Sequence, residues 1–222
     1  MPAAAIFLNG SYPNEHIGFY RRIIESSKGK RLLVAADGGL LLFDQLGLRP
    51  DLIIGDFDSV DAATLAKYSG IEIVRFPNNK DATDGELALR AAVQRGCSDI
   101  EIYGAIDMRY ETDHLLANLF LLKLARRIMP VTTSAATVRA TDHRQHIYLI
   151  ENEELALGGR TGDFISILAL SQEITVSIKG VEWELDRQKV EMGASWTLRN
   201  QFAGEKVDIS LTGAGLVVHR HS

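Results

Sequence analysis

Short apolar runs alternate with amphipathic stretches through the N-terminal part of the chain. The apolar runs, rich in Ile, Val and Leu, are Ala4–Leu8, Arg31–Ala36, Leu52–Gly55, Ile71–Phe76 and Ile100–Gly104. The stretches with a helical period are Glu15–Ser26, Leu40–Leu46, Ala62–Tyr68, Asp84–Arg95 and Asp113–Arg127. Strands and helices in strict alternation predict a parallel sheet with helices on both faces. Within the last stretch, Leu115–Leu124 is apolar nearly all round, which predicts a buried central helix.

Period-two alternation replaces this pattern in the C-terminal part of the chain. The expected strands are Thr137–Ala140, His146–Ile150, Phe164–Leu170, Glu173–Ile178, Trp196–Leu198, Lys206–Leu211 and Leu216–His219. Glycines such as Gly180, Gly193 and Gly213 stand between these runs at the spacing of turns. Short strands separated by turns predict an all-β sandwich or partial barrel. We therefore expect a Rossmann-like parallel α/β domain over residues 1–140 and a β-sandwich domain over residues 141–222.

The composition is that of an ordinary globular protein. The 222 residues are 46% hydrophobic and 24% charged, which allows a sizeable core. A net charge of −5 argues against a general nucleic-acid or anionic-membrane binder. No apolar run has the length of a membrane span, and the N-terminus lacks a basic signal-peptide region. The single cysteine, Cys97, excludes an internal disulfide framework, so we expect a soluble cytoplasmic protein.

Polar clusters follow four of the expected parallel strands. They are Asp37-Gly38-Gly39, Gly55-Asp56-Phe57-Asp58-Ser59, Lys80-Asp81-Ala82-Thr83-Asp84 and the segment that ends in Asp113-His114. Ligands bind at this edge of open α/β sheets, in the crevice outside the carboxyl ends of the strands. The repetition of the pattern favours a functional site at that edge.

Each cluster also has a purely structural interpretation. Asp37 and Asp56 are good helix caps, and Thr83 followed by Glu86 matches a capping box. Asp84 would then stand in the first helical turn, where the helix dipole favours negative charge. Helix capping leaves Lys80 and its neighbour Asp81 without a role, and a lysine there fits a contact to phosphate oxygens.

The chemistry that these residues favour is metal-assisted handling of phosphate. Asp56 and Asp58 repel each other unless a cation or hydrogen-bond donors compensate their charges. Carboxylate and phosphate oxygens suit Mg²⁺, whereas a His/Cys set typical of zinc is missing from these clusters. The sequence has neither Gly-x-Gly-x-x-Gly after the first expected strand nor a P-loop motif. The residues therefore predict Mg²⁺-dependent phosphoryl chemistry and leave the acceptor open.

In their order along the chain, these motifs resemble those of thiamine pyrophosphokinases. The resemblance rests on Ala36–Gly39, Pro50-Asp51 with Gly55–Ser59, Lys80–Asp84, Asp113–Asn118, Lys179–Leu185 and Arg199–Phe202. It spans nearly the whole chain and implies an α/β domain followed by a β-sandwich. It further implies a homodimer with active sites between subunits, which transfers a diphosphoryl group from ATP to the hydroxyl of thiamine and releases AMP.

The resemblance also implies roles for particular residues. Asp56, Asp58 and Asp84 would hold Mg²⁺, and together with Asp81 they form the expected catalytic set. The expected ATP-binding residues are Asp37, Gly38, Gly39, Lys80, Thr83, Arg109, Asp113 and His114. The expected thiamine-binding residues are Trp183, Thr197 and Asn200. Either Asp56 or Asp84 could accept the hydroxyl proton.

Trp183 has an alternative interpretation, because an aromatic side chain on a strand usually packs against its neighbours. Two other positions depart from the family's pattern. Glu111 stands where the family has an arginine, and we expect Arg109 to reach the phosphates instead. Arg199 replaces a common serine near the expected cationic substrate. These departures keep open a diphosphokinase for another hydroxymethyl heterocycle, such as a pterin, or a catalytically silent nucleotide-binding protein.

Overall fold

The chain forms two compact units, residues 1–143 and residues 144–222. Their coordinates come from a computed structural model that describes residues 2–77, 79, 81–106, 112–129 and 137–222. The chain divides after His143, and the domain boundary that we expected lies nearby, after residue 140. Within the described residues, no helix combines the length and the hydropathy that crossing a membrane requires.

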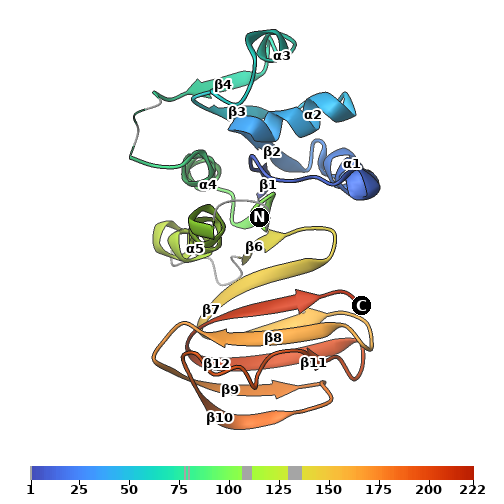
Figure 1. Ribbon diagram of the computed structural model, residues 1–222, viewed down its shortest axis with the longest axis vertical. Coiled ribbons are helices and arrows are strands. Elements are labelled where there is room, and N and C mark those ends of the chain that lie inside the picture. The colour runs from blue at the N-terminus through green and yellow to red at the C-terminus, as the bar shows by residue number, and fades with distance from the viewer. Residues whose placement is uncertain (1, 78, 80, 107–111, 130–136) are drawn as a thin grey trace. The chain divides into compact units, whose positions relative to one another are not determined.

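The first unit is a parallel sheet in the strand order β6-β5-β1-β2-β3-β4. Its strands are β1 (Ala3–Phe7), β2 (Arg31–Ala36), β3 (Leu52–Gly55), β4 (Glu72–Arg75), β5 (Asp99–Tyr103) and β6 (Thr137–Thr141). Its α-helices are α1 (Ile17–Ser27), α2 (Leu40–Leu46), α3 (Ala62–Ala66), α4 (Asp84–Gln94) and α5 (Thr112–Ile128). Two short 3-10 helices are η1 (Asn14–His16) and η2 (Asp37–Gly39). Helices α1 and α2 lie on one face of the sheet, and α4 and α5 lie on the other (Figure 1).

The predicted strands and helices of this unit are confirmed to within a few residues. Buried apolar side chains of β1, β2 and β3, such as Phe7, Leu33 and Ile53, pack under α1 and α2. The capping prediction for α4 is also confirmed, since Thr83 Oγ1 accepts a hydrogen bond from the Glu86 backbone N–H at 3.2 Å. Because every parallel strand ends at the same edge, the loops after β1, β2 and β3 lie together there.

Helix α5 differs from the prediction of a helix buried on all sides. Only Leu121, Leu122 and Ala125 are buried among its described side chains. Leu116 and Phe120 are 49% and 55% exposed. These two residues are four positions apart, so they form one apolar stripe on the outer face of the helix. The apolar pattern of α5 therefore comes from two apolar faces. The rest of the unit covers one of them, and the other is exposed.

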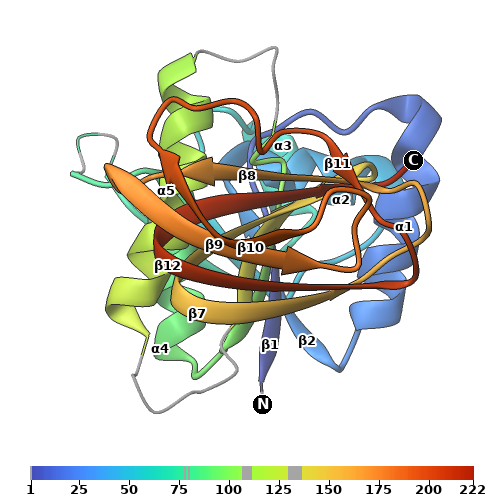
Figure 2. The ribbon, with the colours of Figure 1, turned by 90° about the horizontal axis from the view of Figure 1, so that it is seen from below.

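The second unit is antiparallel. Its strands are β7 (Gln145–Gly158), β8 (Phe164–Ala169), β9 (Glu173–Lys179), β10 (Leu185–Glu191), β11 (Asn200–Gln201) and β12 (Lys206–Arg220). Strand β12 pairs with β7 along its length, with β9 through residues 208–212 and with β8 through residues 215–220. Figure 2 shows β12 between β7 and β9. The parallel α/β unit followed by an antiparallel β unit confirms the predicted fold class.

Three predictions for this unit are wrong in detail. Lys206–Leu211 and Leu216–His219 are one strand, because Gly213, at φ +96°, forms a bulge instead of a turn. Trp196–Leu198 is a turn that leads to Arg199 at φ +60°. Strand β10 escaped prediction because it is an edge strand with only Val190 buried, so it lacks an apolar alternation.

Candidate active site

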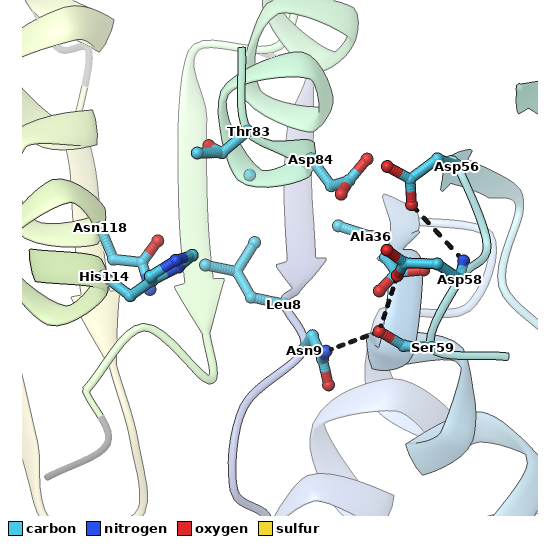
Figure 3. A pocket seen from close by; sticks show the side chains of 12 residues that line it. Leu8, Asn9, Ala36, Asp56, Asp58, Ser59, Thr83, Asp84, His114 and Asn118 are labelled. Carbon is cyan, nitrogen blue, oxygen red and sulfur yellow. Dashed lines mark hydrogen bonds between the residues drawn. The ribbon is translucent and has the colours of Figure 1, made fainter. Parts of the chain in front are cut away.

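A cavity of about 600 Å³ lies at the carboxyl edge of the parallel sheet. Asn9 follows β1, Asp37 follows β2, and Asp56, Asp58 and Ser59 follow β3. Thr83 and Asp84 come from the start of α4, and His114 and Asn118 come from α5, as Figure 3 shows. Leu8, Ala36 and Gly85 complete the lining. The cavity therefore gathers side chains from five segments that are far apart in the sequence.

The loop after β3 holds its two carboxylates by a tight local turn. Phe57 stands between them at φ +64°, a conformation that non-glycine residues rarely adopt. The Asp58 backbone N–H approaches Asp56 Oδ1 at 3.5 Å, and Ser59 Oγ donates to Asp58 Oδ1 at 3.1 Å. Asn9 Nδ2 donates in turn to Ser59 Oγ at 3.2 Å, which connects this loop to the end of β1 (Figure 3).

Asp37 is the most unusual residue of the cavity. It is 4% exposed, and within the described part of the chain its Oδ1 atom has no hydrogen-bond partner. Its backbone is also at φ +45°, in the left-handed region. Backbone strain and an unsatisfied buried carboxylate oxygen both cost stability, and such costs concentrate at functional sites. Asp37 therefore fits a ligand that supplies positive charge.

The glycines beside Asp37 are required by close packing. A Cβ on Gly39 would lie 2.0 Å from the Phe7 carbonyl oxygen, and one on Gly38 would lie 2.2 Å from Asn9 Oδ1. A Cβ on Gly55 would lie 3.1 Å from the Asp37 Cα. The turn after β2 can thus press against the ends of β1 and β3 only because these positions carry no side chain. This close approach brings the Asp37 carboxylate to the Asp56–Asp58 loop.

Asp37, Asp56 and Asp58 form one acidic group. One carboxylate oxygen from each lies within 4.8 Å of the others. Three carboxylates that converge on one point are a donor set for a hard divalent cation, which takes oxygen ligands. The sequence-based prediction grouped Asp56 and Asp58 with Asp84. Asp84 lines the same cavity but lies outside this group, and Asp37 stands in it instead.

Two helix N-termini also open on the cavity. Thr83 is the N-cap of α4 and Asp84 its first residue. His114 and Asn118, one turn apart on α5, present their side chains from the other side of the cavity (Figure 3). The first backbone N–H groups of a helix have no partner within the helix and favour anions such as phosphate. The cavity therefore combines a site for a cation with positions that suit phosphate groups.

The remaining residues of the predicted site lie in different places. Gly38 and Gly39 are buried, and the lining of the cavity includes neither of them nor Asp81 or Asp113. Asp113 Oδ1 accepts a hydrogen bond from the backbone N–H of His114 at 2.8 Å. Lys80, Arg109 and Glu111 lie outside the described residues.

The sequence-based prediction missed three polar residues of the cavity, Asn9, Ser59 and Asn118. Asn9 follows the first strand, so the rule that placed the other clusters at strand ends also applies to it. Asn118 lies four residues after His114 and so shares a helix face with it. Both signals were present in the sequence, whereas the role of Ser59 as a link to Asn9 needs the structure.

The three residues that we expect to bind thiamine lie in the second unit. The Trp183 side chain is on the surface, 61% exposed. The Asn200 side chain holds the backbone of Trp183 from both sides: its Oδ1 accepts from the Trp183 N–H at 3.2 Å, and its Nδ2 donates to the Trp183 carbonyl at 2.7 Å. Thr197 is buried and donates its hydroxyl to the Ile167 carbonyl at 2.6 Å. Within this unit, Asn200 holds the backbone of Trp183, and Thr197 anchors the turn that precedes Asn200.

The acidic cavity at the strand ends of the parallel α/β unit suits a protein that binds phosphate groups together with a divalent cation. Two family models match the chain, and together they cover most of it. The catalytic domain of thiamin pyrophosphokinase matches residues 24–133, and its vitamin B1 binding domain matches residues 145–216. The chain belongs to the thiamine pyrophosphokinase family, and it is an enzyme that makes thiamine diphosphate.

Solved structures of similar fold include three thiamine pyrophosphokinases. The one from Bacillus subtilis is 20% identical, with a TM-score of 0.82 and 99% of each chain covered. The one from Candida albicans is 15% identical, with a TM-score of 0.81, and 99% of this chain and 90% of that chain are covered. The one from Geobacillus thermodenitrificans is 22% identical, with a TM-score of 0.77, and 100% of this chain and 98% of that chain are covered. At these identities the likeness establishes the fold. Comparison with curated protein sequences returned no match.

Proposed function

We propose that this enzyme transfers a diphosphoryl group from ATP to the hydroxyl of thiamine, with Mg²⁺ in the acidic cavity. The observation that carries the proposal is the buried carboxylate of Asp37, which lies beside Asp56 and Asp58 and whose Oδ1 has no hydrogen-bond partner among the described residues. A divalent cation supplies the missing partner and compensates the mutual repulsion of the three carboxylates. The nature of these ligand atoms, all carboxylate oxygens, suits Mg²⁺.

In this proposal the chain's residues mainly position the reactants. Asp37, Asp56 and Asp58 hold Mg²⁺, which when bound neutralises charge on the phosphates of ATP. Thr83, His114 and the start of α4 line the cavity, and in this proposal they contact the phosphates of ATP. The other residues that we propose for the ATP site are Gly38, Gly39, Lys80, Arg109 and Asp113. Phosphoryl transfer of this kind depends on alignment and electrostatics and needs no covalent intermediate.

The transfer itself makes one bond and breaks another. The thiamine hydroxyl oxygen attacks the β-phosphorus of ATP, and the bond from that phosphorus to the oxygen shared with the α-phosphate breaks, so AMP leaves. A carboxylate must accept the hydroxyl proton. Asp84, which lines the cavity at the start of α4, is the carboxylate that we propose for this role. Asp56 is the alternative, and Asp81 is the remaining member of the proposed catalytic set.

Trp183 is the proposed contact for the thiamine rings. Its exposed indole, held by the two hydrogen bonds from Asn200 to its backbone, offers a flat face to a cationic heterocycle. Arg199, the residue that favoured a different substrate, lies with its guanidinium 5.0 Å from the centre of the Phe164 ring. That stacking gives the Arg199 guanidinium a partner within the β unit, while its positive charge remains.

We further propose that the enzyme is a homodimer. Exposed apolar side chains occur on both units: Leu116 and Phe120 on α5, and Met192 and Trp196 in the β unit, are all 49–56% exposed. Clusters of large exposed apolar side chains mark contact surfaces. Light scattering should give twice the chain mass, and Phe120→Glu should shift it toward the monomer. A monomeric wild-type enzyme would refute this part of the proposal.

The test of the proposed reaction is the release of AMP from ATP and Mg²⁺, measured by chromatography with and without thiamine. We expect AMP and thiamine diphosphate in equal amounts, and only when thiamine is present. AMP formed with a pterin alcohol but not with thiamine would assign a different acceptor. ATP binding without AMP from either acceptor would identify a silent nucleotide-binding protein. Either result would overturn the proposal.

A further inference from the structure

A second cluster of metal-binding side chains lies in the β unit. Asp163 stands in the turn between β7 and β8, and His219 and His221 lie at the end of β12. One ligand atom from each of the three lies within 4.8 Å of the others. Asp163 and His219 are 1% and 2% exposed, whereas the His221 side chain is 44% exposed. The cluster is thus closed toward the core and open to solvent at His221.

Strand geometry explains why these residues meet. His219 lies in β12, and His221 follows that strand directly, with its N–H bonded to the Arg144 carbonyl at 2.8 Å beside the β7 partner strand. Alternate residues of such an extended segment point to the same side, so the two imidazoles share one face. Strand β8 begins directly after Asp163 and runs beside the end of β12, where Ile165 pairs with His219. The Phe202 ring stacks on the His219 imidazole at a centroid distance of 4.7 Å, which fixes the orientation of that ring. The cluster is therefore built by the fold rather than by flexible surface side chains.

Backbone groups orient the Asp163 carboxylate. Its Oδ1 accepts from the Ser222 N–H at 2.9 Å, and its Oδ2 accepts from the Arg160 N–H at 3.1 Å. Burial raises the pKa of Asp163, but these hydrogen bonds and those from the two imidazoles outweigh it and hold the pKa below its usual range. Burial lowers the pKa of His219. The carboxylate is thus held with its Oδ2 toward the two imidazoles.

The distances from the carboxylate to the two imidazoles are close to those between ligands of a tetrahedral site. Asp163 Oδ2 lies 3.1 Å from His219 Nε2 and 3.5 Å from His221 Nδ1. Zinc bonds to nitrogen and oxygen are about 2.0–2.1 Å long, so neighbouring ligand atoms of a tetrahedral site lie about 3.3 Å apart. The spacing between the carboxylate and each imidazole is therefore close to that of two ligands of one zinc ion.

We propose that Asp163, His219 and His221 form a site for a borderline divalent metal ion of the zinc type. Two imidazole nitrogens and one carboxylate oxygen favour Zn²⁺ or Co²⁺ over Mg²⁺, which takes oxygen ligands. Water completes the tetrahedron on the exposed side. The ion ties the end of β12 to the turn that begins β8, so it stabilises the β unit. This site is independent of the acidic cavity, which belongs to the other unit.

The test is a metal titration of the full chain without an affinity tag, in excess Mg²⁺ so that the acidic cavity is occupied. We expect calorimetry to give one Zn²⁺ per chain, and Co²⁺ to show the intense visible absorption of four-coordinate geometry. His221→Ala should weaken the binding on the order of tenfold or more. Because His221 is partly exposed, this variant keeps the fold, which its thermal melt without metal will verify.

Two control variants separate the proposed site from other binding. His16→Ala removes an exposed imidazole of the first unit and should leave Zn²⁺ binding unchanged. Asp56→Ala alters the acidic cavity and should also leave it unchanged. Zn²⁺ should raise the melting temperature of the wild type but not of His221→Ala. Failure to bind Zn²⁺ in excess Mg²⁺, equal binding by His221→Ala, or loss of binding in Asp56→Ala would each overturn the proposal.

Discussion

Replacing Asp37 with Asn should stabilise the metal-free enzyme and weaken its binding of Mg²⁺. Asn keeps the size of the side chain and tolerates the left-handed backbone at φ +45° as well as Asp does. The substitution therefore changes the charge of the acidic group and leaves the backbone strain as it is. A residue with a purely structural role would show the opposite sign, since its loss destabilises the protein with or without metal.

The expected size follows from the spacing of the three carboxylates. At a separation of 4.8 Å, two unit charges repel by about 0.9 kcal/mol in water and about 3.5 kcal/mol at an effective dielectric constant of about 20. Asp37 has two such neighbours, so with the value for water Asn should relieve about 2 kcal/mol in the metal-free state. A divalent ion attracts a carboxylate twice as strongly as a single charge does. Twice the water value of about 0.9 kcal/mol corresponds to a factor of roughly 20 in a binding constant, so the loss of one carboxylate should weaken Mg²⁺ binding at least roughly 20-fold.

The assay is thermal unfolding of the wild type and Asp37→Asn in EDTA and across a Mg²⁺ titration. We expect the melting temperature of the variant to be higher in EDTA and to rise less with Mg²⁺. Asp44→Asn is the matched control, because Asp44 pairs with Lys67 at 2.8 Å and does not line the cavity. A lower melting temperature of Asp37→Asn in EDTA, or an unchanged response to Mg²⁺, would refute the reasoning.

Three further substitutions test other parts of the structure. Thr83→Ala removes the N-cap of α4 and should lower the free energy of unfolding by about 1 kcal/mol in urea denaturation. Gly39→Ala places a Cβ 2.0 Å from the Phe7 carbonyl oxygen and should cost about 3 kcal/mol or more in the same measurement. For Glu101, burial raises the pKa, but Arg139, the Tyr103 hydroxyl and Arg31 outweigh it and hold the pKa below 4.5. The stability that Glu101 contributes is thus present above about pH 4.5 and is lost as the pH falls through its folded pKa, so Glu101→Gln should flatten the acid limb of a stability–pH curve.

Control variants and contrary outcomes test each of these three predictions. Thr83→Ser keeps a capping hydroxyl and should retain most of the stability that Thr83→Ala loses. Gly47→Ala is a useful comparison for Gly39→Ala, because nothing lies within 4 Å of the added Cβ and the cost there comes from φ +65° alone. Equal losses at both glycines would argue against the steric explanation. If the stability–pH curve of Glu101→Gln has the same slope at acidic pH as that of the wild type, Glu101 does not contribute to acid unfolding.

The sequence was most informative where one physical rule decides the outcome. Arg31–Ala36 and Leu52–Gly55 were predicted with the bounds that the structure has, because fully buried parallel strands are continuous apolar runs between turns. The same rule about strand ends placed Asp56, Asp58 and Asp84 in one cavity. The rule did not predict that Asp37 lies against the Asp56–Asp58 loop. That contact depends on how closely the ends of three strands approach one another, which Gly39 and Gly55 allow.

Prediction was weaker where long-range contacts decide. The apolar pattern of α5 could not show which of its faces the unit covers, so Leu116 and Phe120 were expected inside. In the β unit, Gly213 has the local signature of a turn, and only the pairing of β12 with β7 on both sides of it makes it a bulge. Strand β10, with a single buried residue, is defined by its hydrogen bonds to β9 rather than by its own sequence.

The position of β12 has a consequence for how the protein is made. This strand pairs with β7, β8 and β9, so none of the sheet around it can close before residues 206–220 have left the ribosome. The ladder between Gln145 and Arg220 also joins distant parts of the chain, and such contacts form slowly. All strands of the first unit precede residue 143, so that unit can fold during synthesis. We therefore expect nascent chains that end before β12 to carry a folded α/β unit and a protease-sensitive remainder.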